Sequence, residues 1–433
     1  MKKKCQNIKK NIELRISRNL FLKLREWRTN ILSKHILVVS QYFYPEQFRI
    51  NDICKEWVNK GYKVTVLTGI PNYPQGEYYN GYGLFKNRRE NYEGIDIIRI
   101  PLVPRGNNSL MLSLNYLSFV FSGFFWQLFS KIKADYVFVF GLSPIFQALP
   151  GVWYAKKNNI PCYIYVQDLW PESVEIVTGI SNSLVIDTLD KMVDNIYSSC
   201  DKIFVTSESF VNSIKQRGVL EDKVKFWPQY AEDFYKPLSK SNIKEIPDDD
   251  KLNIVFAGNI GEAQGLDVLP NTAKILKNEN KENIRFNIIG DGRYKETLIK
   301  IIAEKNVENY FNFIPRQPAK KIPEFMSAND IAFLSLSDDP LFEKTIPAKL
   351  QSYMACGMPI VASAGGEVEK IINDSDSGLV SVSGNAEKLA ENIIKLLNLS
   401  EEELNQLSSN SLKYYQENFD KEMLLNKMDK YFR

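Results

Sequence analysis

A lysine at the start of a short predicted helix is the first residue whose position suggests chemistry. Lys349 follows Pro347 in the first turn of this helix, and Gly357 lies just past its end. The backbone N–H groups of a first turn present partial positive charge, so a cation there is unfavourable unless an anion shares the space. A phosphate bound by both would remove the conflict. The alternative is a solvated surface lysine, which costs roughly a few tenths of a kcal/mol.

A glycine-rich segment after a predicted strand offers a second phosphate-binding element. The strand Asn253–Ala257 leads into Gly258, Gly261 and Gly265, and a helix follows from about Leu266. Glycines between a strand and a helix let the backbone approach a phosphate closely. Their spacing differs from the GxGxxG of dinucleotide-binding proteins, and no GKS or GKT follows. We therefore expect neither a nicotinamide site nor a P-loop.

Two carboxylates at the exit of another predicted strand could orient a substrate. Asp168 and Glu172 follow the strand Pro161–Val166 and flank Trp170. The alternative is that they only initiate a helix. The single histidine, His35, lies at the start of an apolar strand, so we expect no mechanism that needs a histidine base.

Two aromatic loops follow the first strands of the chain. The loop 40–48 contains Tyr42 and Glu46 and lies at the carboxyl end of a strand, where open α/β sheets bind ligands. The loop 69–83 contains Asn72 and Tyr73 among its four tyrosines. A rigid loop lined with rings suits a sugar or a lipid-linked acceptor, and surface irregularity alone is the alternative.

The cysteines and acidic residues form no recognisable metal site. The sequence contains five scattered cysteines without a CxxC pair, which argues against a disulfide framework and a zinc site and fits a reducing, cytoplasmic setting. Asp338–Asp339 and Asp248–Asp250 fall in predicted loops or a linker. We therefore expect no metal ion and no cofactor.

Two series of α/β elements must position these candidates. The chain has 433 residues, 44% of them hydrophobic, which is enough for two domains with their own cores. The first series begins at the strand Ile36–Val39 and the second at Asn253. The polar segment 232–251 between them has the composition of a linker. Alternating strands and helices predict parallel sheets in both.

The first 34 residues are strongly basic. They contain 11 Lys or Arg and two Glu, a net charge of +9, which leaves −6 on the remainder of a chain whose total is +3. Interleaved apolar residues allow an amphipathic helix on an anionic membrane surface. There are two alternatives. The segment could be a disordered tail, or the start codon could lie upstream of the true domain start near Ser33. Nucleic-acid binding is not expected, because the body of the chain is acidic.

An uncharged segment of 20 residues, Leu110–Phe129, is long enough to span a bilayer. Ser113, Asn115 and Gln127 are among the polar residues that interrupt it. A span would also split a domain whose next strand, Tyr136–Phe140, belongs to the same sheet. We therefore favour a buried or membrane-dipping helix over a span.

The segment MACGMPIVA, Met354–Ala362, is similar to the MAxGxPVVA segment of the retaining family 4 glycosyltransferases, which have the GT-B fold. Gly365-Gly366 with Glu369 extends the resemblance, and the segments SQYFYPE and QDLWPE resemble a bacterial surface-polysaccharide subgroup. The resemblance covers about residues 35–433. It implies two Rossmann-like parallel-sheet domains, 35–231 on the acceptor side and 252–412 for the nucleotide sugar, which face a cleft. A C-terminal helix, 413–433, would cross back to the first domain, and 1–34 would be an extension.

The sequence departs from the family at several positions that usually carry the chemistry. The two family glutamates would fall on Lys344 and Ser352, so the resemblance leaves Glu343 and Lys349 to do their work. Where the family often has a histidine, this sequence has Gln167 followed by Asp168.

The usual arginine and lysine that bind the donor diphosphate would fall near Asn259 and Gln264. The diphosphate charge would then be met by the glycine-loop amides, Lys349 and Arg316.

The resemblance implies a hexosyltransferase-type enzyme that moves a sugar from a nucleoside diphosphate, with UDP as the expected nucleotide, to a lipid-linked or glycan acceptor, with retention. Its setting would be O-antigen or capsule synthesis, as a peripheral protein on the inner face of the plasma membrane. The implied catalytic residues are Asp168 and Glu343. The implied donor-side residues are Gly258, Asn259, Gly261, Gln264, Arg316, Lys349, Ser352, Gly365, Gly366 and Glu369. The implied acceptor-side residues are Tyr42, Glu46, Asn72, Tyr73 and Glu172.

Two alternatives stay open. One is a nucleotide-sugar epimerase on the same fold. The other is a catalytically silent, sugar-nucleotide-binding scaffold subunit, because the family glutamates and the histidine are absent.

Overall fold

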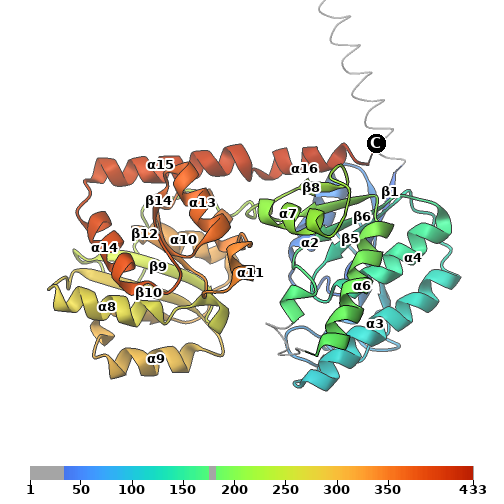
Figure 1. Cartoon of the computed structure of the whole chain (residues 1–433), viewed down its shortest axis with the longest axis horizontal. Helices are drawn as coiled ribbons and strands as arrows, with labels where there is room; N and C mark the ends of the chain where they lie inside the picture. The colour runs from blue at the N-terminus through green and yellow to red at the C-terminus, as the bar shows by residue number, and fades with distance from the viewer. Residues whose placement is uncertain (1–33, 175–181, 433) are drawn as a thin grey trace, which may run out of the picture. The chain divides into compact units, whose positions relative to one another are not determined.

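The computed structural model of the chain describes residues 34–174 and 182–432. The interpretations of the basic N-terminal segment therefore fall outside the described residues, apart from Lys34. The described residues form two compact units (Figure 1). The described residues of the first unit fall within the ranges Met1–Phe204, Arg217–Lys225 and Met428–Arg433, and those of the second within Val205–Gln216 and Phe226–Lys427.

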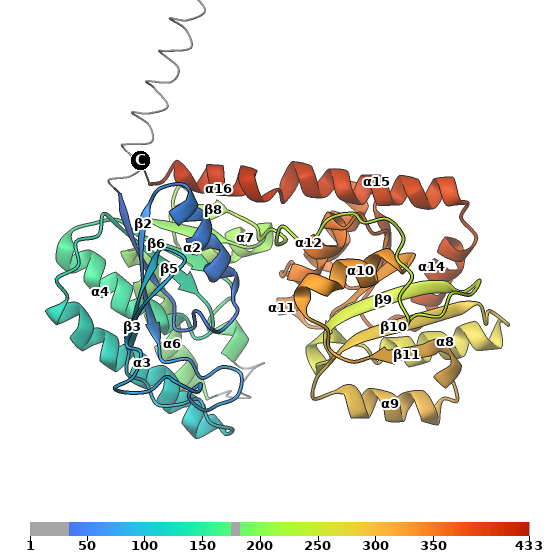
Figure 2. The ribbon, with the colours of Figure 1, turned by 180° about the vertical axis from the view of Figure 1, so that it is seen from behind.

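The first unit is built on an eight-stranded sheet with the strand order β3-β4-β2-β1-β5-β6-β7-β8. Figure 2 labels β2, β3, β5, β6 and β8 of this sheet. Its strands are β1 (His35–Val39), β2 (Lys63–Gly69), β3 (Arg89–Tyr92), β4 (Ile95–Ile100), β5 (Tyr136–Gly141), β6 (Cys162–Val166), β7 (Lys202–Val205) and β8 (Val224–Phe226). Its helices are α2 (Arg49–Asn59), α3 (Ser109–Phe129), η1 (Ile145–Ala148), α4 (Leu149–Asn158) and α6 (Ser183–Ser199). The strands β4, β2, β1, β5 and β6 pair in parallel, whereas β3 is antiparallel to β4.

Helices cover both faces of this sheet, which explains why its central strands are apolar throughout. On one face, a Cβ at Gly151 of α4 would lie 3.0 Å from Val139. On the other face, the ring of Trp57 from α2 packs edge-on against Phe138, with centroids 4.9 Å apart. Phe432, near the end of the chain, packs against Trp57 at 5.2 Å. The C-terminal residues therefore complete the core of the first unit.

The second unit is built on a six-stranded sheet with the order β11-β10-β9-β12-β13-β14, in which every neighbouring pair is parallel. Its strands are β9 (Leu252–Asn259), β10 (Ile284–Asp291), β11 (Phe311–Ile314), β12 (Ile331–Ser335), β13 (Ile360–Ser363) and β14 (Gly378–Ser381). Its helices are α7 (Glu208–Gln216), η2 (Glu262–Gln264), α8 (Val268–Asn278), α9 (Lys295–Glu304), η3 (Glu308–Tyr310), η4 (Ala319–Lys321), α10 (Ile322–Ser327), α11 (Pro340–Glu343), α12 (Ala348–Ala355), α13 (Gly366–Ser375), α14 (Ala386–Leu397), α15 (Glu401–Asn418) and α16 (Lys421–Asp429).

Alternate residues of β9 enter two separate hydrophobic cores. Ile254 and Phe256 pack with α8, α9 and α14. Val255 and Ala257 pack with α10, α12 and α13. Each face of a sheet receives every second side chain, so a strand that is apolar at every position must be covered on both sides. The prediction of two parallel-sheet α/β domains is confirmed.

The strand orders place a topological switch point in each sheet. In the first unit β1 lies between β2 and β5, and in the second unit β9 lies between β10 and β12. Open α/β sheets bind ligands outside the carboxyl ends of their strands at such points. The loop that leaves β1 contains Tyr42 and Glu46 of the predicted acceptor side, and the loop that leaves β9 contains Gly261 and Gln264 of the predicted donor side.

Candidate functional site

The candidate donor site lies at the carboxyl edge of the second sheet. Lys349, in the first turn of α12, extends across the end of β9, where a Cβ at Gly258 would lie 2.4 Å from the Lys349 Cε. The φ of Gly258, +154°, favours glycine at that position, and a larger residue there would also displace the end of the Lys349 side chain. The ammonium of Lys349 donates to Gln264 Oε1 and lies 4.3 Å from the centroid of the Phe256 ring. Burial lowers the pKa of Lys349 to about 7, because the charged form loses hydration.

The loop after β9 is held against the end of β12. Ser335 Oγ donates to the carbonyl of Gln264 at 2.5 Å, and the Ser337 N–H donates to the carbonyl of Ala263 at 3.1 Å. Gly265 has φ +56°, and a Cβ there would lie 3.1 Å from the Ser337 backbone. These contacts fix the peptide groups that would face a bound phosphate.

Glu343 and the paired glycines Gly365 and Gly366 are brought together at the start of α13. A Cβ at Gly366 would lie 2.0 Å from the carbonyl oxygen of Glu343, and Gly366 has φ +61°. A Cβ at Gly365 would lie 3.4 Å from Glu343 Oε1. No side chain caps the N-terminus of α13, so its first N–H groups can receive an anion.

Other predicted donor-side residues lie at the same edge without a contact that fixes a role. Asn259 and Glu369 are exposed, and Ser352 Oγ donates to the carbonyl of Ala348 at 3.1 Å within α12. Arg316 is exposed beyond β11, two strands from β9, which corresponds to about 10 Å across the sheet. Their roles stay predictions.

In the first unit, Glu46 joins the two aromatic loops. Its carboxylate accepts backbone N–H groups from Phe43 at 3.2 Å, Asn72 at 2.8 Å and Tyr73 at 2.7 Å. Burial raises the pKa of Glu46 to about 7, although the three N–H donors act in the opposite direction. Glu46 and Asn72 therefore position the loops.

An aromatic cluster with one arginine forms on these loops. The ring of Tyr42 stacks on Phe48 at 5.4 Å and lies 5.5 Å from Tyr73. Arg105, which follows β4, donates to the Tyr42 hydroxyl at 3.2 Å and lies over the Tyr73 ring at 5.2 Å. We did not predict Arg105 from the sequence. In the sequence, the only feature that could have indicated Arg105 is that it is a basic residue shortly after a strand whose end lies at the ligand-binding edge.

Asp168 lies at the exit of β6 and is held by Ser143, which, like Arg105, the sequence did not indicate. Its carboxylate accepts from the backbone N–H of Ser143 at 3.2 Å and from Ser143 Oγ at 2.8 Å. Trp170 Nε1 donates to Ser143 Oγ at 2.9 Å. Burial raises the pKa of Asp168, and the Ser143 donors partly offset this. Glu172 is exposed at the start of a helical turn, and its role stays a prediction.

Aromatic contacts link the surroundings of Arg105 to those of Asp168. Tyr116 of α3 packs edge-on against Phe146 at 6.2 Å, and Phe146 packs against Trp170 at 5.8 Å. Tyr116 is also an electrostatic neighbour of both Arg105 and Asp168. The carboxyl edge of the first sheet thus offers rings, a cation and a carboxylate together, which suits a sugar that carries an anionic group.

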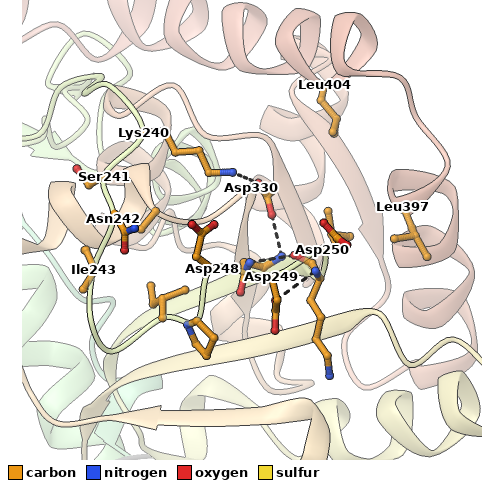
Figure 3. Close-up of a pocket in the computed structure, with 16 residues that line it drawn as sticks. Lys240, Ser241, Asn242, Ile243, Asp248, Asp249, Asp250, Asp330, Leu397 and Leu404 are labelled. Carbon is orange, nitrogen blue, oxygen red and sulfur yellow. Dashed lines mark hydrogen bonds and ion pairs between the residues drawn. The ribbon is translucent and has the colours of Figure 1, made fainter.

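A hollow of about 540 Å³ lies at the opposite, amino edge of the second sheet (Figure 3). Lys240, Asp249 and Asp330 are among the residues that line it. Asp330 accepts from the Asn253 N–H at 2.8 Å, just where β9 begins. Ligands of parallel sheets bind at the carboxyl edge, so we do not assign this hollow to the donor.

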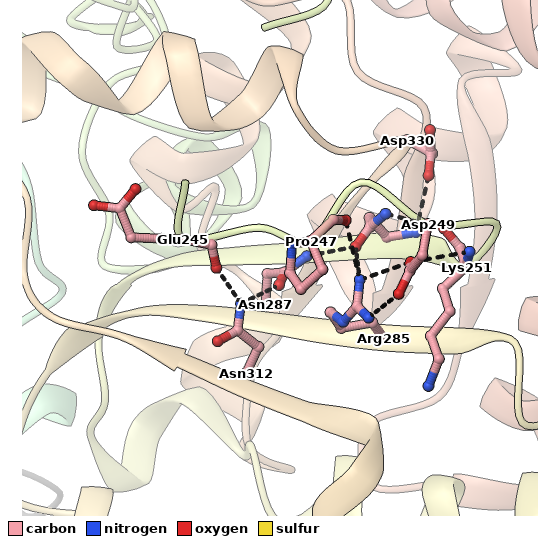
Figure 4. A network of polar contacts seen from close by, with 9 residues as sticks. Glu245, Pro247, Asp249, Lys251, Arg285, Asn287, Asn312 and Asp330 are labelled. Carbon is pink, nitrogen blue, oxygen red and sulfur yellow. Dashed lines mark hydrogen bonds and ion pairs between the residues drawn. The ribbon is translucent and has the colours of Figure 1, made fainter. Parts of the chain in front are cut away.

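The polar network beside this hollow joins the linker to the sheet (Figure 4). Arg285 donates to both carboxylate oxygens of Asp249, at 3.0 and 2.5 Å, and lowers its pKa. Asn312 donates to the carbonyl of Glu245 and to Asn287 Oδ1, both at 2.8 Å. These contacts are satisfied within the protein, and their role is structural.

Metal-binding groups do not gather in the described part of the chain. Within residues 34–174 and 182–432, no three His, Cys, Asp or Glu side chains lie where they could hold a metal ion. The cysteines among those residues, Cys54, Cys162, Cys200 and Cys356, are buried and free.

Two family models match the chain. Residues 48–229 match the family described as Glycosyltransferase Family 4, and residues 239–414 match Glycosyl transferases group 1. A protein of Escherichia coli K12 named as a colanic acid biosynthesis glycosyl transferase is 26% identical over 349 residues, which cover 76% of this chain and 83% of that protein. A Pseudomonas aeruginosa protein named as a glycosyltransferase is 25% identical over 287 residues, 64% of this chain and 70% of that protein.

Solved structures with the same fold include sucrose-phosphate synthase from Thermosynechococcus elongatus, with a TM-score of 0.72 and 15% identity over 92% of this chain and 98% of that one. Anabaena HepE, solved in complex with UDP, has a TM-score of 0.65 and 14% identity with the same coverage. The GT-B fold is thereby confirmed. These comparisons give the epimerase alternative no support.

Proposed function

Because this chain consists of two glycosyltransferase-type domains with the GT-B fold, we propose that it moves a hexosyl group from a nucleoside diphosphate to a lipid-linked or glycan acceptor. The nucleotide is UDP, and the anomeric configuration is retained. The product belongs to a cell-surface polysaccharide such as an O-antigen or a capsule. The enzyme works in the cytoplasm at the inner face of the plasma membrane.

The observation that carries the donor proposal is the environment of Lys349. Its ammonium has Gln264 and the Phe256 ring as neighbours, both of them neutral, at the edge of the sheet where ligands bind. A half-buried cation that has lost hydration and has no anion beside it is costly, and a diphosphate would remove that cost. UDP is supported by the UDP complex of Anabaena HepE, which shares the fold.

The acceptor proposal is supported by the aromatic cluster of the first unit and by the relatives. Tyr73 presents a ring that is 37% exposed and to which a sugar can bind, Tyr42 is buried beside it, and Arg105 adds a cation for a phosphate. The similar protein of Escherichia coli is named for colanic acid biosynthesis, and an Erwinia amylovora protein, 28% identical over 146 residues, is named for amylovoran biosynthesis.

In the proposed reaction the acceptor hydroxyl attacks the anomeric carbon from the side on which the UDP leaves. The bond between that carbon and the phosphate oxygen breaks, and the hydroxyl proton passes to the leaving diphosphate. Lys349, the amides after β9 and the open end of α13 stabilise the charge that develops on the diphosphate. Asp168 orients the acceptor hydroxyl, and Glu343 orients the donor sugar.

Nucleotide binding is tested by thermal unfolding of the full chain with UDP, GDP, dTDP and CMP. A ligand present at about 100 times its dissociation constant stabilises the folded state by about 2.7 kcal/mol. We expect UDP to raise the unfolding temperature selectively. Selective stabilisation by another nucleotide would replace UDP in the proposal, and no stabilisation by any of them would contradict the donor site.

Product analysis tests the reaction. With a UDP-sugar and a lipid extract as acceptor, we expect a new glycosidic bond whose anomeric proton coupling matches that of the donor. Inversion of that coupling would contradict retention. An epimerised donor without a new bond would identify an epimerase, and nucleotide binding without any product would favour the silent scaffold.

A further inference from the structure

Helix α3 of the first unit has an inverted distribution of side chains. Its buried positions are Asn115, Phe119, Gly123 and Gln127, which recur every fourth residue and include two amides and a glycine. Its outward positions hold the large apolar side chains Leu110, Leu114, Leu117, Phe121, Phe124, Phe125, Leu128 and Phe129. From Leu114 to Phe129 every exposed side chain is apolar. We favoured a buried or membrane-dipping helix from the sequence, and because only 17% of the apolar segment is buried, the first of these two alternatives is wrong.

The inner stripe attaches α3 firmly to the domain. Asn115 accepts from Gln41 Nε2 at 2.7 Å and donates to the carbonyl of Val103 at 2.6 Å. A Cβ at Gly123 would lie 2.3 Å from Pro150, so α3 packs directly on α4, which lies beside it (Figure 1). A helix with this much fixed contact along one side cannot leave the domain to cross a bilayer. Length and composition alone had left a span open.

Positive charge gathers at the C-terminal end of α3. Lys131 and Lys133 follow it and are exposed, and Lys156 and Lys157 are exposed at the end of α4. Lys157 also donates to the carbonyls of Gln127 and Leu128, at 2.8 and 2.7 Å. The helix itself has no charged residue. An apolar face with lysines at its margin matches the boundary between acyl chains and anionic headgroups.

We propose that α3 lies in the plane of an anionic bilayer, with its outward face at the boundary of headgroups and acyl chains. A protein partner fits less well, because even the cores of protein interfaces are only about 65% apolar. The outward face from Leu114 onward offers no exposed polar side chain to such a partner. Membrane binding would help catalysis only if the acceptor is lipid-linked, as the proposed function states. The binding of α3 to a bilayer does not itself depend on the proposed function.

Vesicle flotation of the full chain tests whether the outward face of α3 binds an anionic bilayer. The vesicles contain phosphatidylcholine alone or equal parts of phosphatidylcholine and phosphatidylglycerol. We expect binding to the anionic vesicles, weakened by salt, and at least a roughly tenfold loss of affinity when Leu117→Glu and Phe121→Glu are combined, because charges are costly in the boundary.

The matched control is Leu220→Glu. Phe121 and Leu220 are both 66% exposed, but Leu220 precedes β8, the sheet edge opposite β3. We expect the control to bind vesicles like the wild type. Thermal stabilisation by UDP and turnover with a water-soluble acceptor should stay unchanged in all variants, which separates a failure of this proposal from a failure of the proposed function.

Depth measurements distinguish a helix in the plane from a span. Environment-sensitive labels on Leu114→Cys, Phe121→Cys and Leu128→Cys, each with Cys5→Ser, report depth through quenching by brominated lipids. The other four cysteines are buried. A helix in the plane places the three labels at equal depth, whereas the 21 residues of a span would cover about 30 Å.

Three results would overturn the proposal. Vesicle binding that is unchanged in the Leu117→Glu and Phe121→Glu variant would assign it to another segment, such as the basic N-terminus. Depths that vary strongly along α3 would indicate a span. A wild-type dimer that the variant dissociates, without vesicle binding, would identify a second copy as the occupant.

Discussion

The ammonium of Lys349 donates to the amide oxygen of Gln264, a neutral partner for a half-buried cation. Within the described part of the chain no carboxylate forms an ion pair with Lys349, and loss of hydration is what lowers its pKa to about 7. The free protein therefore holds this lysine near the midpoint of its titration at neutral pH. A bound diphosphate would favour the charged form.

The affinity for UDP should depend on pH through Lys349. Its pKa of about 7 in the free protein means that the ammonium is increasingly neutral above pH 7, while the UDP phosphates stay ionised. If UDP binds only the charged form, its affinity falls up to about tenfold for each pH unit above 7. Isothermal titration calorimetry between pH 7 and 9 measures this fall.

Lys349→Arg is the control for this prediction, because a guanidinium stays charged over the whole range. Its UDP affinity should be nearly flat from pH 7 to 9, whatever its absolute value. Equal slopes in the variant and the wild type would mean that another group causes the pH dependence.

The same lysine predicts a pH dependence of stability. Its pKa is 10.5 unfolded and about 7 folded, so between these values the unfolded chain binds more protons. The free energy of unfolding should then rise with pH relative to Lys349→Met, by at most about 1.4 kcal/mol per pH unit. Urea unfolding at pH 7, 8 and 9 compares the two proteins, and parallel curves would show that Lys349 is charged in the free protein.

The sequence predicted the fold, and the same physical reason accounts for the proximity of Gly258 and Lys349, whose role in donor binding stays a prediction. Apolar runs of strand length require cover on both faces, and residues at the ends of parallel strands share one edge, so Gly258 and Lys349 could be expected to lie close together. Arg105 and Ser143 could not be predicted in this way. Arg105 reaches Tyr42 across 63 residues, and Ser143 reaches Asp168 across 25. Such contacts depend on how loops from different strands pack, which no local pattern specifies.

Helix α3 shows the same limit. Its length and apolar composition were evident, but the sequence did not reveal that the stripe with Asn115 and Gln127 faces inward. Amides are usually expected on the solvent side, and here the hydrogen bonds of Asn115 to Gln41 and Val103 hold its amide inward.

Gly366→Ala should destabilise the second unit strongly. Gly366 has φ +61°, and a Cβ there would lie 2.0 Å from the carbonyl oxygen of Glu343. Backbone strain and the displacement of Glu343 together should cost about 3 kcal/mol. Gly384→Ala is the matched control, because Gly384 has φ +75° with no atom within 4 Å, and it should cost only about 1 kcal/mol. Denaturant unfolding measures both, and equal costs would argue against the tight contact with Glu343.

Arg105→Gln should weaken acceptor binding without changing donor binding. Arg105 is held by the Tyr42 hydroxyl and the Tyr73 ring, and the substitution removes its charge from the aromatic cluster. We expect KM for an acceptor that carries a phosphate to rise about tenfold, which corresponds to the loss of one charged hydrogen bond. The affinity for UDP should stay within about twofold of the wild-type value, because Arg105 lies in the other unit from the proposed donor site.

Arg89→Gln removes a charge from an exposed arginine on β3 in the same unit and serves as the control. If it raises KM as much as Arg105→Gln does, the effect comes from the net charge of the unit. An unchanged KM in Arg105→Gln would remove this residue from the acceptor site.

Asp168→Asn should lower turnover and leave UDP binding intact. The amide keeps the shape of the carboxylate and can still accept from Ser143, but it loses the charge that we propose orients the acceptor hydroxyl. We expect kcat to fall about 100-fold or more, in the range usual for a positioned carboxylate. Full turnover with full UDP binding would exclude Asp168 from the reaction.

Ser143→Ala separates a functional carboxylate from a structural one. The two Ser143 donors favour the charged form of Asp168 and hold its pKa below the value that burial alone would set. Removing Ser143 Oγ raises the pKa of Asp168 further. If the reaction needs the carboxylate ionised, the acid side of the pH profile of kcat must move to higher pH in Ser143→Ala. In Asp168→Asn the fall of kcat on the acid side must be absent from that pH range, because an amide does not titrate there. A profile that neither substitution moves would leave Asp168 with only a role in anchoring the loop that contains Ser143.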